Sequence, residues 1–543
     1  MAVHRWEDFS GGLRTDVYQS LINDNESPDC KNVWTPYGGA LTKRPGINRL
    51  TTGSVGFDKV YTATLTPLKE PWSGHYVQYL YGFTPNTAGS PDNAMARTSS
   101  GGGSWTSGQP TNPILDSSRP VYMNNKIYIN TTAGIESDDA SSGSDVFSLV
   151  SGSPIAHLIC SYKGFLFGAV DSGEAVFNTL QWSSLGDPTL WPTSFKVVVG
   201  AKDGLAITGL QVYGDSLYIF KGPRYFNQTT QSSGASQKAS IYKLTGDSVT
   251  LSNATYQLEE LPLSQDTACI FPHSIGQWDE RMVFLSQNGV MSFDGNSLTN
   301  ITSKIYPTTK KWFQFKTDTY FTNLLAKEPT IAIDEGRLFL SQSETGTESD
   351  RTGILIDNTM NVVYCFEPEG RIWRWTNSTG ISAMAVDSAG SHIAIGWRTG
   401  WSSPAGAAAA FYRIDRTDIL YDDARADESP VGINAKYRTK EFDFKQLQHF
   451  KYAYVDFSRQ KSGILNVRYN VDQKGWVERK VDMSGTYGSI KRSQRLLIGD
   501  HGRTIQFEFA NNEAYVNFEI FGLELHTDVK HLDNTGGSPS VAS

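Results

Sequence analysis

The chain has 543 residues, of which 19% are charged, and its formal net charge is −8. A surface that binds nucleic acid tightly needs clustered Lys and Arg to displace condensed counterions, so this mild acidity argues against a protein built around such a surface. The 50 glycines and 25 tyrosines favour a β-rich fold with many turns, and the length allows several domains or one large repeat domain.

The sequence shows no pattern for secretion, membrane insertion or disulfide formation. The first residues, MAVHRWEDFSGG, contain no apolar core of a secretory signal, and no window of about 18 apolar residues predicts a membrane span. The four cysteines (Cys30, Cys160, Cys269 and Cys365) lie far apart and form no C-x-x-C pair, which predicts isolated reduced thiols rather than a zinc site. We expect synthesis in the cytoplasm, without direct membrane insertion.

Residues 30–46, CKNVWTPYGGALTKRPG, combine an aromatic residue, a glycine pair and two adjacent cations. This mixture admits three interpretations: a nucleotide-binding loop, a basic patch for nucleic acid, or two short strands around a turn. The segments CKNVW and GALTKR alternate as the strands of a hairpin do, with TPYGG as the turn. The pairs Gly11–Gly12 and Gly38–Gly39 supply the freedom in φ that turns require. We therefore expect a hairpin in this stretch.

Lys43 and Arg44 follow an acidic stretch, and Asp24, Glu26 and Asp29 are their candidate partners. Such a pairing would connect the hairpin to the loop before it, within one chain or across a subunit boundary. The favoured interpretation is a role in assembly or in closing a blade of the fold. An ordinary local ion pair and a contact with phosphate are the alternatives.

Between residues 121 and 397 one pattern recurs six times: a short apolar strand, a small polar turn, and a second apolar strand. The segments are VYMNNKIYIN (121–130), LICSYKGFLFGAV (158–170), GLQVYGDSLYIFKG (209–222), IGQWDERMVFLSQNGV (275–290), TIAIDEGRLFLS (330–341) and ISAMAVDSAGSHIAIGW (381–397), with a looser copy, SGHYVQYLYGF, at 73–83. Their turns lie 39 to 65 residues apart, the period expected of four-stranded propeller blades. The pattern predicts a large β-propeller of about six or seven blades over residues 56–430. Stacked β-sandwiches are the alternative.

Stretches rich in Gly, Ser and Thr lie between the hairpins, at 85–113, 131–145 and 343–353, and their composition predicts exposed loop insertions. Residues 302–315 are the best helix candidate, interrupted by Pro307. Helix content is expected to be low.

From about residue 431 the apolar residues alternate over longer stretches, at 451–458, 463–472, 503–512 and 514–529. This alternation is typical of half-buried strands and predicts a C-terminal antiparallel β-sandwich over residues 431–530 of an all-β protein. Residues 1–55 are expected to form an N-terminal arm that carries the hairpin. Residues 531–543 have the composition of a disordered tail.

The chain contains no P-loop, no G-x-G-x-x-G after a strand, no H-E-x-x-H and no G-x-S-x-G, and its histidines are scattered. We therefore expect no enzyme, no cofactor and no metal site. The acidic pairs Asp138–Asp139, Glu259–Glu260 and Asp422–Asp423 raise the possibility of a glycosidase, which needs two carboxylates. The repeated S-x-D-x-G-x-x-W box of sialidase blades is missing, so solvated loop charges are the favoured interpretation. The 13 tryptophans are read as core residues rather than as sugar-stacking platforms.

The full stretch FSGGLRTDVYQSLINDNESPDCKNVWTPYGGALTKRPG (9–46) resembles the N-terminal signature of tail nozzle proteins (tail tube B type) of short-tailed, podovirus-like bacteriophages. Two later stretches agree: WSSLGDPTLW (182–191) is similar to a turn that recurs in such proteins, and QFEFANNEAYVNFEIFGLELHTD (506–528) resembles their final sandwich strands. The N-terminal residues form a candidate assembly motif, which consists of Phe9, Gly11, Gly12, Asp24, Glu26, Asp29, Trp34, Gly38, Gly39, Lys43, Arg44, Pro45 and Gly46.

The resemblance implies a structural virion component. Six copies would form a ring-shaped conduit below the head-to-tail adaptor, which retains the genome and passes it during ejection. The implied partners are other copies of the chain in a homohexamer, the adaptor protein, tail fibres or a tip or plug protein, and double-stranded DNA in transient, non-specific passage. The implied location is the virion tail, assembled in the host cytoplasm. The alternatives are a receptor- or glycan-binding β-propeller tail protein, then a glycan-cleaving enzyme, and a free bacterial propeller that acts as an interaction scaffold.

Overall fold

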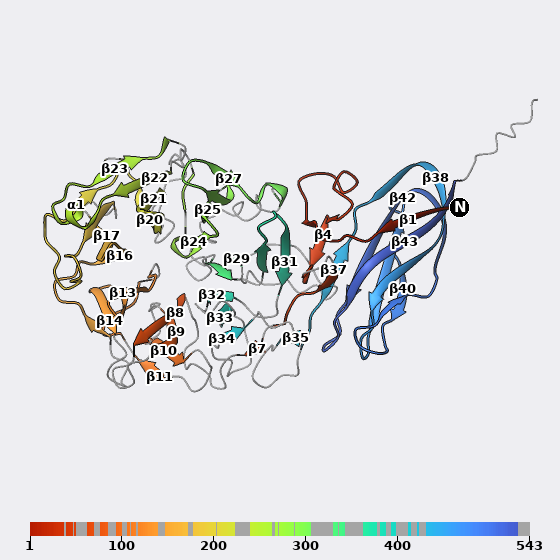
Figure 1. The fold of residues 1–543 in the computed structure, drawn as a ribbon, viewed down its shortest axis with the longest axis horizontal. Helices are drawn as coiled ribbons and strands as arrows, with labels where there is room; N and C mark the ends of the chain where they lie inside the picture. Colours follow the sequence, from red (N-terminus) through yellow and green to blue (C-terminus); the bar gives the residue numbers. More distant parts are fainter. Residues whose placement is uncertain are drawn as a thin grey trace, which may run out of the picture. The chain divides into compact units, whose positions relative to one another are not determined.

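The structure is a computed structural model of the 543-residue chain, shown as a ribbon in Figure 1. It describes residues 1–36, 40–46, 48–49, 62–69, 76–84, 94–99, 106–108, 110–115, 118–138, 147–171, 178–201, 203–222, 239–262, 267–269, 271–286, 288–305, 330–334, 336–342, 362–376, 381–386, 393–397, 411–413, 421–422 and 431–529. The chain divides into two compact units. The sheet unit comprises Met1–Arg44, Arg371–Arg374 and Gly432–Ser543, and the propeller unit comprises Pro45–Gly370 and Trp375–Val431.

The described residues contain seven four-stranded antiparallel sheets that are the blades of a β-propeller (Figure 1). Blades one to four are β8 (Thr62–Lys69), β9 (Tyr76–Thr84), β10 (Ala94–Ser99) and β11 (Thr106–Gly108); β12 (Val121–Met123), β13 (Lys126–Thr131), β14 (Gly134–Asp138) and β15 (Ser148–Leu149); β16 (Ala156–Tyr162), β17 (Phe165–Val170), β18 (Thr179–Trp182) and β19 (Lys196–Val198); and β20 (Ala206–Tyr213), β21 (Ser216–Gly222), β22 (Ser240–Thr245) and β23 (Gln257–Glu260). Blades five to seven are β24 (Ile275–Trp278), β25 (Arg281–Ser286), β26 (Gly289–Phe293) and β27 (Leu298–Asn300); β28 (Thr330–Asp334), β29 (Arg337–Gln342), β30 (Val362–Phe366) and β31 (Ile372–Thr376); and β32 (Ile381–Val386), β33 (Ile393–Trp397), β34 (Phe411–Arg413) and β7 (Asn48–Arg49).

The propeller predicted from the recurring hairpins is confirmed, with seven blades among the described residues. Each of the six predicted hairpins forms the first two strands of a blade, from β12–β13 to β32–β33. Two turns show why the sequence folds in this way. Asn124 and Asn125 have φ of 51° and 59°, and Lys163 and Gly164 have φ of 47° and 81°, as two-residue turns between antiparallel strands require. The described residues of the looser copy at 73–83 belong to β9, the second strand of the first blade.

The propeller closes into a ring through its first and last blades. The first strands of successive blades lie against one another from β12 to β32, and β32 lies against β8. The outer strand of the last blade comes from near the N-terminus, because β7 pairs with β34 through Arg49–Tyr412 and Asn48–Arg413. A short strand outside the predicted hairpins thus completes the ring.

Aromatic residues fill the space between blades. Trp182 of β18 is fully buried, and its ring stacks on Phe167 at a centroid distance of 5.4 Å. Its indole N–H donates to the carbonyl of Leu251 at 3.2 Å. Leu251 belongs to α1 (Ser248–Ser252), a helix that the sequence did not predict and whose capping box is formed by Asp247 and Thr250. These contacts confirm the core interpretation for Trp182.

Two polar stretches that the sequence assigned to loops contain blade strands. β14 lies within 131–145, and β10 and β11 lie within 85–113. β14 is polar yet mostly buried, because the carboxylate of Glu136 accepts the backbone N–H groups of Thr111 and Asn112, each at 2.9 Å. Polar composition therefore misled the prediction where internal hydrogen bonds satisfy the polar groups. The third stretch, 343–353, lies outside the described residues.

The sheet unit contains one antiparallel sheet of eleven described strands. They are β1 (Ala2–Trp6), β4 (Asp29–Lys31), β5 (Val33–Trp34), β6 (Leu41–Lys43), β37 (Ala435–Arg438), β38 (Phe442–Ser458), β39 (Ile464–Val471), β40 (Val477–Asp482), β41 (Ile490–Arg492), β42 (Leu496–Asn511) and β43 (Glu519–Val529). The four predicted C-terminal strands correspond to β38, β39, β42 and β43. The long strands β38 and β42 change register at bulges, which bend a strand and let it pair with different neighbours along its length.

The remaining elements are short. β2 (Gly12–Leu13) pairs in parallel with β3 (Glu26–Ser27), and β35 (Tyr421–Asp422) pairs with β36 (Val431–Gly432). The 3₁₀ turns are η2 (Pro272–Ser274) and η3 (Ser303–Ile305). The helix expected over 302–315 is described only as η3, and its remainder lies outside the described residues. Among the described residues, no helix has the length and apolar character needed to cross a membrane.

The N-terminal residues do not stand apart from the C-terminal strands. The sequence placed residues 1–55 in an arm of their own, whereas Met1–Arg44 cluster with Gly432–Ser543. Within that unit β1 pairs with β43, and β4 pairs with β37. The expected tail, residues 531–543, lies outside the described residues.

We predict that removal of residues 1–49 abolishes soluble, cooperatively unfolding protein. The last blade would lose β7, and the sheet unit would lose β1, β4, β5 and β6, which leaves open strand edges. Size-exclusion chromatography and differential scanning calorimetry measure the outcome. Removal of residues 531–543 is the matched control and should leave the melting temperature unchanged. A 50–543 protein that melts like the full chain would contradict this role for the N-terminal strands.

Candidate functional site

The candidate site is the N-terminal segment, residues 9–46, in the sheet unit and at the start of the propeller unit. The predicted hairpin is confirmed: β5 pairs with β6 through Val33–Lys43 and Trp34–Thr42. Trp34 is buried, and Pro45 and Gly46 are buried where the chain leaves the hairpin toward β7. Gly38 and Gly39 lie outside the described residues, so their expected role in the turn stays a prediction.

Phe9 anchors the start of the N-terminal segment. Its side chain is 1% exposed and meets the rings of Tyr437 and Phe509 edge-on, at centroid distances of 5.7 and 6.1 Å. The two rings come from β37 and β42 of the same sheet. Burial of a phenylalanine of this kind typically contributes about 1.5–3 kcal/mol, so Phe9 is a structural contact.

The pair Gly11–Gly12 allows close approach of neighbouring chain segments. Gly12 has a φ of +74°, and a Cβ atom there would lie 2.7 Å from the carbonyl oxygen of Ile372. A Cβ atom on Gly11 would lie 2.6 Å from Cγ of Glu26. Glycine is therefore required here for backbone conformation at one position and for space at both.

The three acidic residues proposed as partners of Lys43 and Arg44 form ion pairs with other cations. Asp24 contacts Lys440 at 2.7 Å, and Glu26 contacts Arg14 at 3.0 Å. Asp29 contacts Lys436 at 2.6 Å and Arg438 at 3.3 Å. The carboxylates of Asp24 and Asp29 thus connect the N-terminal segment to β37 and the residues that follow it.

Lys43 and Arg44 are buried, with 3% and 1% exposure. The ammonium group of Lys43 donates to the carbonyl oxygen of Glu513 at 3.0 Å. The Nε–H of Arg44 donates to Oδ1 of Asn32 at 3.0 Å, and its backbone N–H donates to the carbonyl of Asn32 at 2.9 Å. Because both side chains are buried among protein groups, they do not form a surface patch that could grip phosphates.

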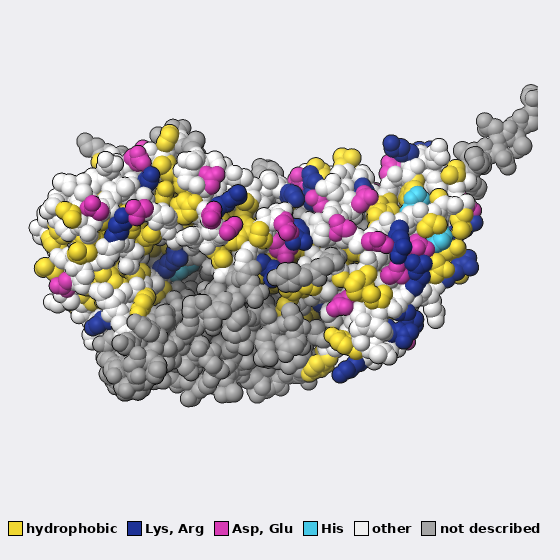
Figure 2. All heavy atoms as spheres, in the orientation of Figure 1, with side chains coloured by type: hydrophobic (Ala, Val, Ile, Leu, Met, Phe, Trp, Pro, Cys, Tyr) yellow, Lys and Arg dark blue, Asp and Glu magenta, His cyan; other side chains and the backbone are white. Residues whose placement is uncertain are grey.

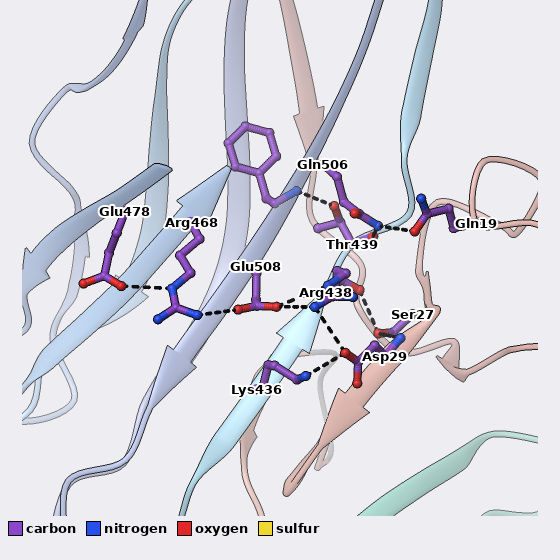
Figure 3. Close-up of polar contacts among 11 residues, drawn as sticks. Gln19, Ser27, Asp29, Lys436, Arg438, Thr439, Arg468, Glu478, Gln506 and Glu508 are labelled. Atoms are coloured by element: carbon purple, nitrogen blue, oxygen red, sulfur yellow. Dashed lines mark hydrogen bonds and ion pairs between the residues drawn. The ribbon is translucent and has the colours of Figure 1, made fainter. Parts of the chain in front are cut away.

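A chain of alternating charges runs from the N-terminal segment into the sheet (Figure 3). From Asp29 it passes to Arg438, whose Nη2 lies 2.7 Å from Oε2 of Glu508. The other oxygen of Glu508 lies 3.2 Å from Nη1 of Arg468, and Arg468 in turn contacts Glu478 at 2.9 Å. Glu508 is only 4% exposed, so its charge is held by the two guanidinium groups.

These charges affect the acidity of Asp29 and Arg468. Burial acts to raise the pKa of Asp29, but the charges of Lys436 and Arg438 and the hydrogen bond from Lys436 outweigh it and hold the pKa below its usual value. The hydrogen bond with Glu478 raises the pKa of Arg468. Asp29 is therefore ionised at neutral pH, and it lies beside the cations Lys436 and Arg438.

The second family-like stretch, residues 182–191, is a turn between β18 and β19. Asp187 accepts the backbone N–H and the hydroxyl of Thr189, at 2.9 and 2.6 Å. The indole N–H of Trp191 donates to the carbonyl of Pro188 at 2.7 Å. The amide of Asn124 donates to the carbonyl of Gly186 at 3.0 Å, which connects this turn to the preceding blade. These residues thus serve blade-to-blade contact.

The expected acidic pairs differ in their surroundings. Asp138 is 4% exposed and accepts a hydrogen bond from the hydroxyl of Tyr81 at 3.4 Å, so the interpretation as a solvated loop charge was wrong for this residue. Glu259 and Glu260 are exposed on β23, as expected. Asp139 and Asp423 lie outside the described residues, and Asp422 is described only as part of β35. The described part of the chain contains no group of three or more His, Cys, Asp or Glu that could hold a metal ion.

The four cysteines are free thiols, as predicted, and three of them are buried whereas Cys160 is half-buried. Burial raises the pKa of Cys30 to about 12 and that of Cys160 to about 11. Thiols with such pKa values stay protonated at neutral pH and are poor nucleophiles. These residues act as small apolar core groups.

No family model matches the chain, and no curated protein matches it. Solved structures similar to it include the exo-β-1,3-galactanase from Phanerochaete chrysosporium with galactose (9% identity, 88% of this chain and 100% of that chain, TM-score 0.27), a luciferin-regenerating enzyme (8%, 69% and 96%, TM-score 0.35) and the C-terminal WD40 domain of Sif2 (11%, 68% and 99%, TM-score 0.32). Similarities of this size carry no argument about activity. The strand pairing itself establishes that the chain is an all-β protein with a propeller.

We predict that Glu508→Gln lowers the free energy of unfolding by about 2–3 kcal/mol, because it leaves two guanidinium groups without their shared charge. The cost stays below that of a fully buried pair, since Arg438 and Arg468 are 26% and 33% exposed. Equilibrium urea unfolding measures it. Glu478→Gln, at a carboxylate that is 38% exposed, is the control and should cost less than about 1 kcal/mol. Equal effects of the two variants would contradict the central role of Glu508.

We also predict a pH-dependent contribution from Asp29. Its pKa is lowered in the folded protein, so the stability it adds is present above its unfolded pKa of about 3.9 and is lost as pH falls through the folded pKa. The gap in melting temperature between the wild-type chain and Asp29→Asn should therefore be constant from pH 7 to about 5 and should narrow below about pH 4. A gap that widens on acidification would refute this linkage.

Proposed function

We propose that this protein is a structural virion protein, the tail nozzle of a short-tailed bacteriophage. The observation that most supports this proposal is that the family-like N-terminal residues pack and form hydrogen bonds within the chain itself. Phe9, Gly12 and Arg44 are all fixed by contacts within the chain, and the segment leads directly into β7, which closes the propeller. Residues that serve the framework in this way suit a scaffold better than a catalyst.

The surface charge agrees with a conduit for DNA. On the face shown in Figure 2, Lys and Arg side chains are interspersed with Asp and Glu. The net charge of the chain is −8, and Lys43 and Arg44 are buried. A wall on which cations are interspersed with carboxylates lets a polyanion pass, because it offers little gain from counterion release.

The proposal includes the implied assembly: a homohexameric ring in the virion tail, assembled in the host cytoplasm, between the head-to-tail adaptor on one side and the fibres or a tip or plug protein on the other. Double-stranded DNA passes through it transiently, and the protein does not insert into a membrane. It is not an enzyme in this proposal. The most buried acidic residue of blade two, Glu136, already accepts three hydrogen bonds, which leaves it poorly suited to general acid or base work.

A receptor- or glycan-binding propeller tail protein is the second candidate function, with a glycan-cleaving enzyme as its less favoured form. The buried carboxylates Glu136 and Asp138 lie two residues apart on β14, which is the observation in favour of chemistry. A hydrolysis assay on a glycan array tests it, and turnover that is lost in Glu136→Gln would favour the enzyme.

We predict that electron microscopy of the virion or of the purified chain shows a six-fold ring on the tail axis. Particles assembled without this protein should package DNA and then lose it, as measured by nuclease-sensitive DNA in the particle fraction. Supply of the wild-type protein in trans is the control and should restore retention.

Two outcomes would overturn the nozzle proposal. A monomer, or density confined to peripheral fibres, would exclude the ring. Particles that keep their DNA but no longer adsorb to the host would favour the receptor-binding alternative.

A further inference from the structure

The sheet unit contains a cleft of about 220 Å³ beside the charge network of Figure 3. Gln19 lies in the loop between β2 and β3. The other lining residues come from β37, β39 and β42 and from the segments next to them. Four planar amides form much of its lining: Gln19, Asn470, Gln473 and Gln506. The other lining residues are Arg438, Glu441 and Trp476. All belong to the sheet unit.

We propose that this cleft binds one ring of a neutral sugar. The inference concerns the sheet unit alone and does not rest on the tail nozzle proposal. Three properties of the cleft support it: its ionic residues already have partners within the protein, its amides keep unused hydrogen-bonding atoms, and it contains an exposed indole.

The ionic side chains of the cleft already have partners within the protein: Arg438 is paired with carboxylates, and Glu441 accepts hydrogen bonds from neutral groups. The Nε and Nη2 atoms of Arg438 lie 3.2 and 2.7 Å from Glu508, and Nη2 also contacts Asp29. Glu441 is 5% exposed and accepts hydrogen bonds from Gln19 at 3.3 Å and from Thr504 at 3.0 Å. Because these charges are paired or solvated internally, the cleft has little to offer an ionic ligand and favours a neutral one.

The amides present both donors and acceptors to the cleft. Within the described part of the chain, no hydrogen bond from another protein group engages Nδ2 of Asn470, Oε1 of Gln473 or Oε1 of Gln506, although the other amide atom of each residue is engaged. One N–H₂ donor and two carbonyl acceptors therefore remain. Sugar hydroxyls both donate and accept, so vicinal hydroxyls match such a set, whereas an aliphatic ligand would leave it unsatisfied.

Trp476 supplies the apolar component. Its side chain is 38% exposed, in contrast to the buried tryptophans of the propeller. The guanidinium carbon of Arg438 lies 5.0 Å from the indole centroid, and this contact steadies the ring. An exposed indole offers a flat apolar surface to the C–H face of a pyranose, and the planar amides beside it can bond the sugar hydroxyls.

The turn that carries Trp476 is built in a constrained form. It follows β39, and Asp472 and Gln473 have φ of 48° and 57°. Oδ1 of Asn470 accepts the backbone N–H of Gly475 at 3.1 Å, and Gly475 has a φ of +127°. The hydroxyl of Tyr18 accepts the amide of Gln473 at 2.9 Å. Side chains that line the cleft thus also hold the turn, which keeps the site formed before a ligand arrives.

The size of the cleft limits the ligand to a single ring. Clefts for drug-sized ligands typically have volumes of about 300–1,000 Å³, and this one is smaller. Glu441 is the one carboxylate among its lining residues, whereas glycoside hydrolysis requires two carboxyl groups across the scissile bond. The site is therefore suited to holding a sugar unit of a glycan and not to cleaving it.

The test is a saturation-transfer NMR titration of the full chain with methyl α-D-glucopyranoside, methyl α-D-mannopyranoside and methyl β-D-galactopyranoside. We expect at least one of them to bind saturably with a Kd of about 1–10 mM, as a single-ring ligand with few contacts should. Trp476→Ala should weaken that binding at least tenfold, and Gln473→Ala should weaken it several-fold. Tyr487→Ala removes an aromatic ring that is 63% exposed and does not line the cleft, so binding should be unchanged.

Three outcomes would overturn the inference. The first is that no neutral pyranoside saturates the protein at concentrations below about 50 mM, because binding that weak would mean that there is no formed site. The second is that Trp476→Ala and Gln473→Ala keep the melting temperature of the wild-type chain and also bind the sugar as it does. The third is that glucuronate binds more tightly than every neutral pyranoside, which would make the cleft an anion site. None of these results bears on the ring expected by microscopy, so failure of the two proposals is distinguishable.

Discussion

The pairing of the first strands with the last ones is the constraint on which the structure depends. β1 pairs with β43 from Ala2–Thr527 to Trp6–Leu523, and β4 pairs with β37. Because the partners come from opposite ends of a 543-residue chain, this sheet cannot be completed before the propeller strands have been made. β7 adds the same requirement to the last blade. One N-terminal segment therefore completes both units, which explains why it carries so many buried residues.

The sequence predicted the fold where the signal is local. Turns such as Lys163–Gly164 have their own conformational preference, and the strands beside them alternate, so the blades and their number were close to correct. The prediction failed where strands pair across a large separation in sequence. It also failed where buried polar groups are hydrogen-bonded within the fold. β7 has two residues and no apolar pattern, and β14 contains Glu136, whose burial depends on Thr111 and Asn112 from another segment. Composition alone cannot show such partners.

The same reasoning explains why the hairpin of the candidate site was predicted correctly and the partners of its charged residues were not. The hairpin followed from alternation, but the partners of its acidic neighbours did not, since Asp29 pairs with Lys436 and Arg438 about four hundred positions later. Lys and Arg are rarely buried, so Lys43 and Arg44 gave no sign of their burial, and their backbone and amide partners have no sequence signature. Trp476 was grouped with core tryptophans, although the polar turn around it, with Asp472 and Gly475, was a signal of exposure.

Arg438 belongs both to the charge network and to the sugar cleft. Its pairing with Asp29 and Glu508 attaches the N-terminal segment to the sheet, and the same pairing removes the positive charge that would otherwise draw anions into the cleft. The cleft then presents the indole of Trp476, which packs against the guanidinium of Arg438. It also presents amide atoms that have no hydrogen-bond partner in the described part of the protein. The ion pairs that attach the N-terminal segment to the sheet thus also leave a surface suited to neutral hydroxylated ligands. In a tail protein of the kind we propose, such a surface would allow contact with a glycan without any catalytic group.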